Sequence, residues 1–126
     1  MFESETIVVE IFVNRMVLRS LASGHSLEVA PSTPFSHPRM LLGDFNVAER
    51  ALKEALHKMR KPRFWTMPPK VVLHPRERLE GGLSPIEHRA ITELAIAAGA
   101  MKVGLFEGNG TVTAVQAAAA LAAPRK

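Results

Sequence analysis

The side chains that could carry out chemistry are few in this sequence and far apart. Glu10 is the single charged residue of the apolar run TIVVEIFV at positions 6–13. A carboxylate there could face a site, but a lone acid in a strand more often points to a sheet edge or to solvent, and we favour that interpretation. The histidines show no i, i+4 pair and no neighbouring carboxylate, so the sequence predicts no metal site. They are His25, His37, His57, His74 and His88.

The remaining polar groups have structural explanations. Asp44 precedes a helical pattern and is predicted to cap it rather than to act in catalysis. The glycine pairs at 81–82 and at 108 and 110 predict turns, because neither combines with the Lys-Thr motif of a nucleotide loop. His88 falls on the polar side of a predicted helix, where we expect it to be solvated. The chain contains no cysteine, which excludes disulfides, thiolate metal ligands and a cysteine nucleophile.

One loop combines aromatic and basic residues. Phe64, Trp65 and Met67 lie among basic side chains in the stretch KPRFWTMPP at 61–69. A shallow membrane insertion would use the aromatic rings, with basic residues attracted to anionic lipid by about 1 kcal/mol each. Alternatively, Trp65 folds back and covers the end of the preceding helix. Both interpretations remain open, and the candidate membrane or partner loop comprises Lys61, Arg63, Phe64, Trp65 and Met67.

Composition predicts one folded domain over residues 1–126, because 47% of the residues are hydrophobic and 22% are charged. The net charge of +4 permits contact with nucleic acid or acidic lipid but is too small to indicate it, and we predict no nucleic-acid partner. The amino end has no basic segment before its apolar run, which is unlike a signal peptide. No apolar run is long enough to cross a bilayer, so we expect a cytoplasmic location, with contact at the inner face of the membrane if the loop inserts.

Hydrophobic periodicity predicts five strands and three helices. The strands are expected at 6–13, 15–22, 27–30, 70–73 and 103–106, and the helices at 45–59, 85–98 and 111–123. The second helix has the clearest signals: Ser84 and Glu87 form a capping box, Pro85 suits the first turn, and Gly99 ends it. Its predicted apolar stripe is Ile86, Ala90, Ile91, Leu94, Ala97 and Ala98.

The order of these elements predicts an α/β fold. A hairpin sheet followed by two right-handed crossovers gives a mixed five-stranded sheet with helices on both faces, in the order βββαβαβα. That order matches the ribonuclease H-like fold, which is also the core of actin-like domains.

Several stretches resemble the bacterial actin family MreB. IEHRAITE at 86–93 and AGAMKVGLFEG at 98–108 are similar to that family's VERRAIRE, AGAREV and LIEEP. LGDFNVAE at 42–49 and PKVVL at 69–73 resemble its IADFEVTE and PRVVI. The resemblance covers only the subdomain called IA, and some MreB-like proteins carry a hydrophobic membrane loop at the place of Phe64 and Trp65. It implies a link to cell shape and the bacterial cytoskeleton.

The departures from MreB concern the nucleotide site. The family's first phosphate loop reads DLGT, whereas this chain has Glu10, Ile11, Phe12 and Val13, with Phe12 in the place of the glycine that admits phosphate. The place of the catalytic glutamate is taken by Gly108, one residue after Glu107. Glu10, Phe12, Val13, Glu107 and Gly108 are therefore degenerate phosphate-site positions, and we predict no ATP, magnesium or other cofactor.

Two classes of function follow from these patterns. The first is a non-catalytic, actin-like interaction or structural protein, acting as a homo-oligomer or with another cytoskeletal protein. The alternative is a small ribonuclease H-like nuclease of the junction-resolvase type. That chemistry needs several carboxylates around two metal ions. Glu10 could supply one, but the strand at 70–73 and the helix at 111–123 contain none, so we favour the first class.

Overall fold

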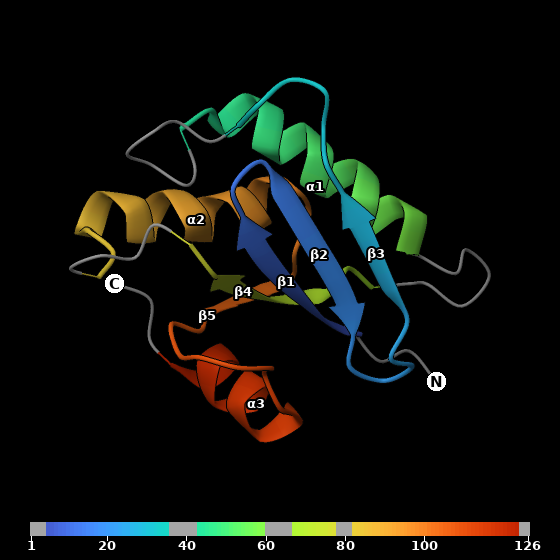
Figure 1. Cartoon of the computed structure of the whole chain (residues 1–126). Helices are drawn as coiled ribbons and strands as arrows, with labels where there is room; N and C mark the ends of the chain where they lie inside the picture. The colour runs from blue at the N-terminus through green and yellow to red at the C-terminus, as the bar shows by residue number, and fades with distance from the viewer. Residues whose placement is uncertain (1–4, 36–42, 60–66, 78–81, 124–126) are drawn as a thin grey trace.

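A mixed sheet of five strands and three helices make up the computed structural model, which describes residues 5–35, 43–59, 67–77 and 82–123 (Figure 1). The small α/β domain predicted from the sequence is confirmed at this level. The elements are β1 Thr6–Phe12, β2 Arg15–Ser20, β3 Ser26–Val29, α1 Phe45–Met59, β4 Lys70–Pro75, α2 Pro85–Ala97, β5 Lys102–Leu105 and α3 Ala114–Ala122.

The strands lie side by side in the order β3-β2-β1-β4-β5. β1 pairs antiparallel with β2, and β2 with β3. β1 pairs parallel with β4, and β4 with β5, so β1 is the central strand. The β1–β2 hairpin turns at Asn14, whose φ of 54° is a left-handed conformation that asparagine adopts more readily than most residues.

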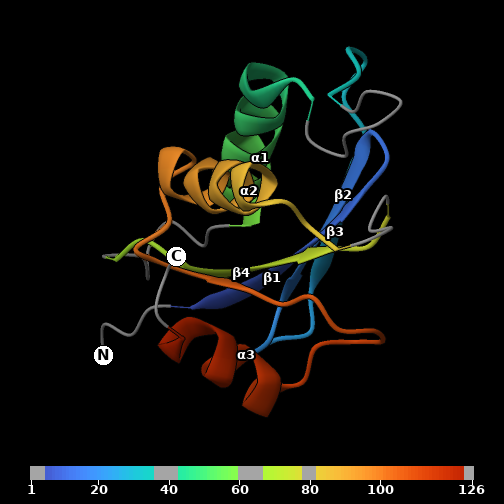
Figure 2. The ribbon, with the colours of Figure 1, turned by 90° about the vertical axis from the view of Figure 1, so that its left-hand side faces the viewer.

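Helices cover both faces of the sheet. Figure 2 shows α1 and α2 on one side and α3 on the other. Successive strand side chains alternate between the faces. Ile7, Val9 and Ile11 of β1 therefore pack towards α1 and α2 in the larger core, whereas Val8 packs with Val72 in a smaller core under α3.

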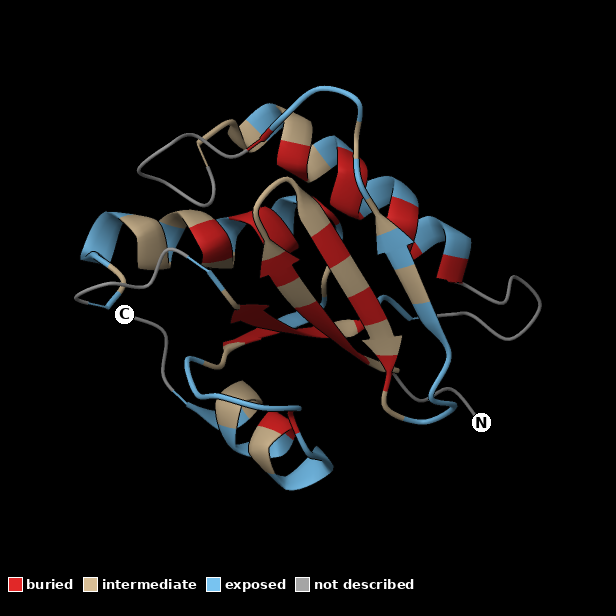
Figure 3. Ribbon diagram, in the orientation of Figure 1, coloured by how far each residue is buried: buried red, intermediate tan, exposed pale blue. Residues whose placement is uncertain are grey.

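The α3 side of the sheet is only partly covered by its helix. Ala117 is the one residue of α3 that is fully buried, and Gly104 of β5 allows the α3 backbone to approach closely. On β2, the residues of this face are Arg15, Val17 and Arg19, and each is half-buried rather than buried (Figure 3). The Nη2 group of Arg19 donates a hydrogen bond to the carbonyl oxygen of Val112, 3.1 Å away, which ties β2 to the segment before α3.

The helix caps predicted from the sequence are confirmed. Asp44 Oδ1 accepts a hydrogen bond from the backbone N–H of Val47 at 3.2 Å. Ser84 and Glu87 form the reciprocal capping box at the start of α2. The third helix was predicted to begin at 111, which was wrong: it begins at Ala114, because Thr113 forms a second capping box with Gln116.

Part of the predicted stripe on α2 was also wrong. Ile86 is 76% exposed and Ala97 is exposed, whereas Ala95 is buried with Ile91 and Leu94. This difference follows from tertiary packing. α2 packs on α1 and β5, and only the side of α2 that faces these two elements is buried. The observed strand ends differ from the predicted ones by only one or two residues. β4 continues through Pro75 because residues 74–75 still pair with Glu10 and Ile11 of β1.

Candidate functional site

The carboxyl ends of the central parallel strands bring together groups that are distant in the sequence. Glu10 of β1 and His74 of β4 are direct partners in the parallel register. Both have the same strand parity as Val8 and Val72, so they lie on the α3 side of the sheet. This end of a parallel sheet is where α/β proteins commonly bind ligands.

Arg76 links Glu10 to the segment that precedes α3. Its Nη1 atom lies 3.2 Å from Glu10 Oε2 and donates a hydrogen bond to the carbonyl oxygen of Gly110 at 2.7 Å. The two charged side chains are 29% and 25% exposed. Our interpretation that Glu10 points to an edge or to solvent was therefore wrong, because β1 is central and the carboxylate has a cationic partner.

His74 is fully buried beside this ion pair. Its Nε2–H donates a hydrogen bond to the carbonyl oxygen of Gly108 at 2.8 Å, and its ring meets Phe106 edge-on, with centroids 4.9 Å apart. Its Nδ1 atom has no hydrogen-bond partner among the described residues. Burial lowers the pKa of His74, and the nearby Arg76 lowers it further, against the raising effects of the Gly108 hydrogen bond and of Glu10.

His74 therefore fastens the end of β4 to the segment at 106–110. In the sequence, His74 falls just after the strand predicted at 70–73, and no role was predicted for it. The signal that could have identified it is its spacing of two from Val72 within the apolar strand VVLHP, which places its side chain on a buried face.

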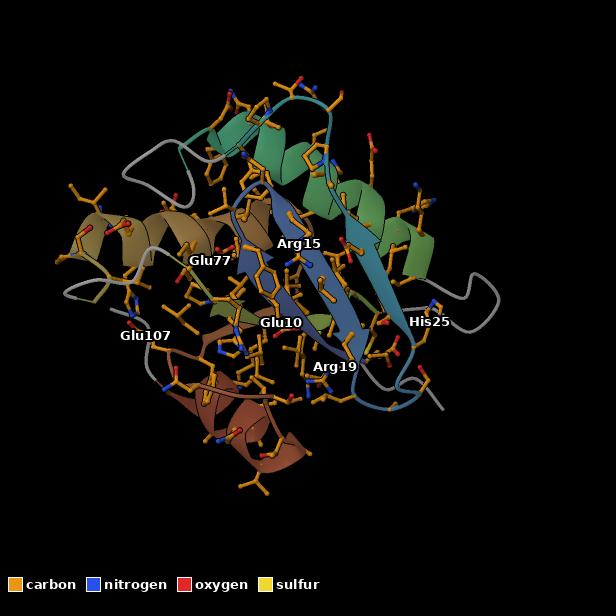
Figure 4. The ribbon with its side chains drawn as sticks, viewed as in Figure 1. Glu10, Arg15, Arg19, His25, Glu77 and Glu107 are labelled. Carbon is orange, nitrogen blue, oxygen red and sulfur yellow. The ribbon has the colours of Figure 1, made fainter. Side chains whose placement is uncertain are left out.

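The other residues that the sequence comparison with MreB predicts to be degenerate phosphate-site positions lie around the same end of the sheet and have partners of their own. Figure 4 shows Glu10, Glu77 and Glu107 at separate places there. Phe12 packs under the guanidinium of Arg15, 4.0 Å from the ring centroid. The backbone N–H of Val13 donates a hydrogen bond to Glu77 Oε1 at 2.8 Å.

Glu107 and Gly108 are engaged as well. The Nε2 atom of His88 lies 3.3 Å from Glu107 Oε2, and the His88 side chain is only 26% exposed. The expectation that His88 is solvated was wrong, because the β5–α3 segment folds against the start of α2. Gly108 supplies the carbonyl that binds His74, and a Cβ at this position would lie 2.5 Å from Cζ of Phe106.

The arrangement offers little to a metal ion. Within the described residues, no three His, Cys, Asp or Glu side chains are grouped so that they could hold one. The carboxylate of Glu10 faces a guanidinium and an imidazole rather than a second carboxylate. What the cluster can do is join β1, β4 and the segment before α3 through charge-assisted and backbone hydrogen bonds.

The predicted membrane or partner loop falls mostly outside the described residues. Lys61, Arg63, Phe64 and Trp65 are not among the described residues. Met67 is described, and its side chain is 38% exposed. Among the described helices, none has the length and apolar character needed to span a bilayer.

A second surface feature lies beside β5, the outermost strand on its side of the described sheet. A hollow of about 450 Å³ opens there between the end of α2 and the end of α3. Ile96 and Met101, each 43% exposed, line it together with Leu121. We call it the β5-edge hollow.

The described elements thus define a small α/β domain whose strand-end polar groups are paired within the chain. None of the known protein-family models matches it. The chain is 32% identical over 103 residues to the "uncharacterized protein YjaA" of Escherichia coli (strain K12), an alignment that covers 78% of this chain and 80% of that protein. This chain belongs to the YjaA family.

Proposed function

We propose that this protein is a non-catalytic interaction module with an actin-like, ribonuclease H-like fold. The support is topological. A β1–β2–β3 meander followed by two α–β crossovers, with the sheet order β3-β2-β1-β4-β5, is the arrangement of that fold class. The MreB-like stretches at 42–49 and 86–108 contribute the start of α1, α2 from its second residue onward, and β5 to the same arrangement.

The observation that carries the non-catalytic part is the Arg76 bridge. Arg76 joins Glu10 to the carbonyl of Gly110 across the end of the sheet where an actin-like protein would hold its nucleotide. Phe12, in the place of the phosphate-loop glycine, is stacked against Arg15. A nucleotide would have to displace both contacts and would meet side chains where it needs free backbone N–H groups.

Calorimetric titration with Mg-ATP tests this part of the proposal. We expect no saturable heat for the wild type, with an ATP-binding MreB protein as the positive control. A dissociation constant in the micromolar range would overturn it. The Arg76→Ala variant extends the test, because removing the bridge alone leaves Phe12 in place and is still expected to give no binding.

The proposed partner is a second copy of this chain, with another cytoskeletal protein as the alternative. The β5-edge hollow supports self-association because it combines a strand at the edge of the described sheet with exposed apolar side chains. In a two-fold arrangement the β5-edge hollows of the two copies would face each other, so that Ile96 and Met101 of one copy pack against the same residues of the other.

Light scattering over a concentration series tests the partner. We expect the wild type to dimerise and Ile96→Glu to stay monomeric. Ile86→Glu is the matched control, since Ile86 is an exposed isoleucine at the opposite end of the same helix. If the wild type is a strict monomer at high concentration, or if both variants dimerise equally, this interface is rejected.

A further inference from the structure

A second groove runs along α3 at the amino ends of the parallel strands, opposite the end that holds Glu10 and Arg76. Its volume is about 510 Å³, within the range of small-molecule sites. One wall is a stripe at i, i+3, i+4, i+7 and i+8 of the helix, and Leu21 lies across from it. The stripe consists of Ala114, Ala117, Ala118, Leu121 and Ala122.

Two lysines stand at the strand end of this groove. Lys70 begins β4 and Lys102 begins β5, and the two are direct partners in the parallel register. Lys70 has the strand parity of Val72, and Lys102 that of Gly104, so both lie on the α3 side. Neighbouring strands are about 4.8 Å apart, so the two lysine side chains leave the sheet side by side and their ammonium groups can reach the same anion.

No ion pair among the described residues neutralises these lysines. Glu5 lines the same groove, where its carboxylate accepts a hydrogen bond from the hydroxyl of Ser20, and with two lysines against this one carboxylate the lining keeps a net positive charge. An anion held between the two ammonium groups would remove their repulsion and would gain charge-assisted hydrogen bonds.

From this combination we propose that the groove binds an aliphatic carboxylate, with the carboxylate between Lys70 and Lys102 and the alkyl chain along α3. The helical wall from Ala114 to Ala122 is about 12 Å long at 1.5 Å per residue, which suits a medium-length chain. Because α3 presents mostly alanine methyl groups there, an alkyl chain can lie close to the helix, and its apolar surface is then removed from water. This inference does not depend on the proposed function.

Calorimetric titration with sodium decanoate, below its micelle-forming concentration, tests the charged end. We expect saturable one-to-one binding by the wild type. The Lys70→Gln/Lys102→Gln variant should raise the dissociation constant at least about tenfold, the effect of losing a charge-assisted contact. Lys53→Gln/Lys58→Gln is the charge-matched control, because Lys53 and Lys58 are both exposed on α1 and line neither groove beside α3.

The apolar wall is tested independently. Ala118→Phe should fill the groove and abolish decanoate binding, whereas Ala119→Phe, an exposed neighbour that does not line it, should leave the dissociation constant unchanged. Circular dichroism checks that each variant is folded. Absence of saturable decanoate binding, equal binding of decanol, or binding only to anionic phosphatidylglycerol vesicles would each overturn the proposal.

Discussion

At the scale of single residues, two ion pairs of similar chemistry differ in their surroundings. Glu10 and Arg76 are 25% and 29% exposed, and Arg76 also binds the carbonyl of Gly110. Glu28 and Arg15 are 58% and 39% exposed, with 3.6 Å between the nearest charged atoms. Exposed pairs contribute about 0–1 kcal/mol because water screens them and the side chains lose freedom.

We therefore expect Glu10→Gln to cost more than Glu28→Gln. The first change removes a charge-assisted contact worth about 1.5–3 kcal/mol and leaves Arg76 half-buried. The second should change the free energy of unfolding by less than about 0.5 kcal/mol. Urea denaturation of the two variants measures the difference, and equal costs would show that the Arg76 bridge contributes no more than a surface pair.

The lowered pKa of His74 determines the direction in which pH changes the stability of the fold. Burial holds its pKa in the folded protein below the ordinary value of about 6.5 that applies to the unfolded chain. The unfolded state therefore takes up the proton first as the pH falls. The stability that His74 provides is complete above about pH 6.5 and is lost below it, by up to about 1.4 kcal/mol per pH unit, until the folded pKa is reached.

Urea denaturation between pH 7.5 and pH 5 measures this effect, and the pH range covers the start of the transition predicted above. The His74→Leu variant should lose that part of the pH dependence, whatever its own stability. His57→Gln is the control, because His57 is exposed on α1. An unchanged slope in His74→Leu would assign the pH dependence to other groups.

At the scale of elements, α3 packs on the sheet through a close backbone approach at Gly104. A Cβ added to Gly104 would lie 2.6 Å from the backbone carbon of Ala120, and backbone cannot rotate out of the way. At Gly108 the obstacle is the Phe106 ring, a side chain that can move. α3 buries little else, since Ala117 is its one fully buried residue.

Gly104→Ala should therefore displace α3 and lower the free energy of unfolding by about 1–3 kcal/mol, as overpacking does. Gly108→Ala should cost less. Hydrogen exchange of the α3 amides reports the displacement directly. Unchanged protection of α3 in Gly104→Ala would mean that the sheet, rather than the helix, absorbs the added methyl group.

At the scale of the whole molecule, the net charge of +4 and the loop with Phe64 and Trp65 lead to a test of binding to an anionic membrane surface. If that loop inserts, its two aromatic rings contribute only a few kcal/mol, so binding to anionic vesicles should be weak, reversible and reduced by salt. Sedimentation of wild type against Phe64→Ser/Trp65→Ser measures it. Equal sedimentation of both proteins would leave Trp65 as a cover for the end of α1.

Much of this protein follows from its sequence alone. The number and type of elements and the caps at Asp44 and Ser84 were predicted correctly. These features depend on periodicity and on hydrogen bonds between residues three or four positions apart, so local sequence contains the necessary information.

The candidate site was decided by tertiary structure. Glu10 and His74 are 64 positions apart in the numbering and become neighbours only through the parallel register of β1 and β4. Arg76, which neutralises Glu10, had no role in the sequence patterns, and the pairing of Lys70 with Lys102 depends on the same kind of register. The exposure of Ile86 and the burial of Ala95 likewise follow from where α2 rests. Strand register and helix placement are set by the packing of the whole core, and no short stretch of sequence encodes them.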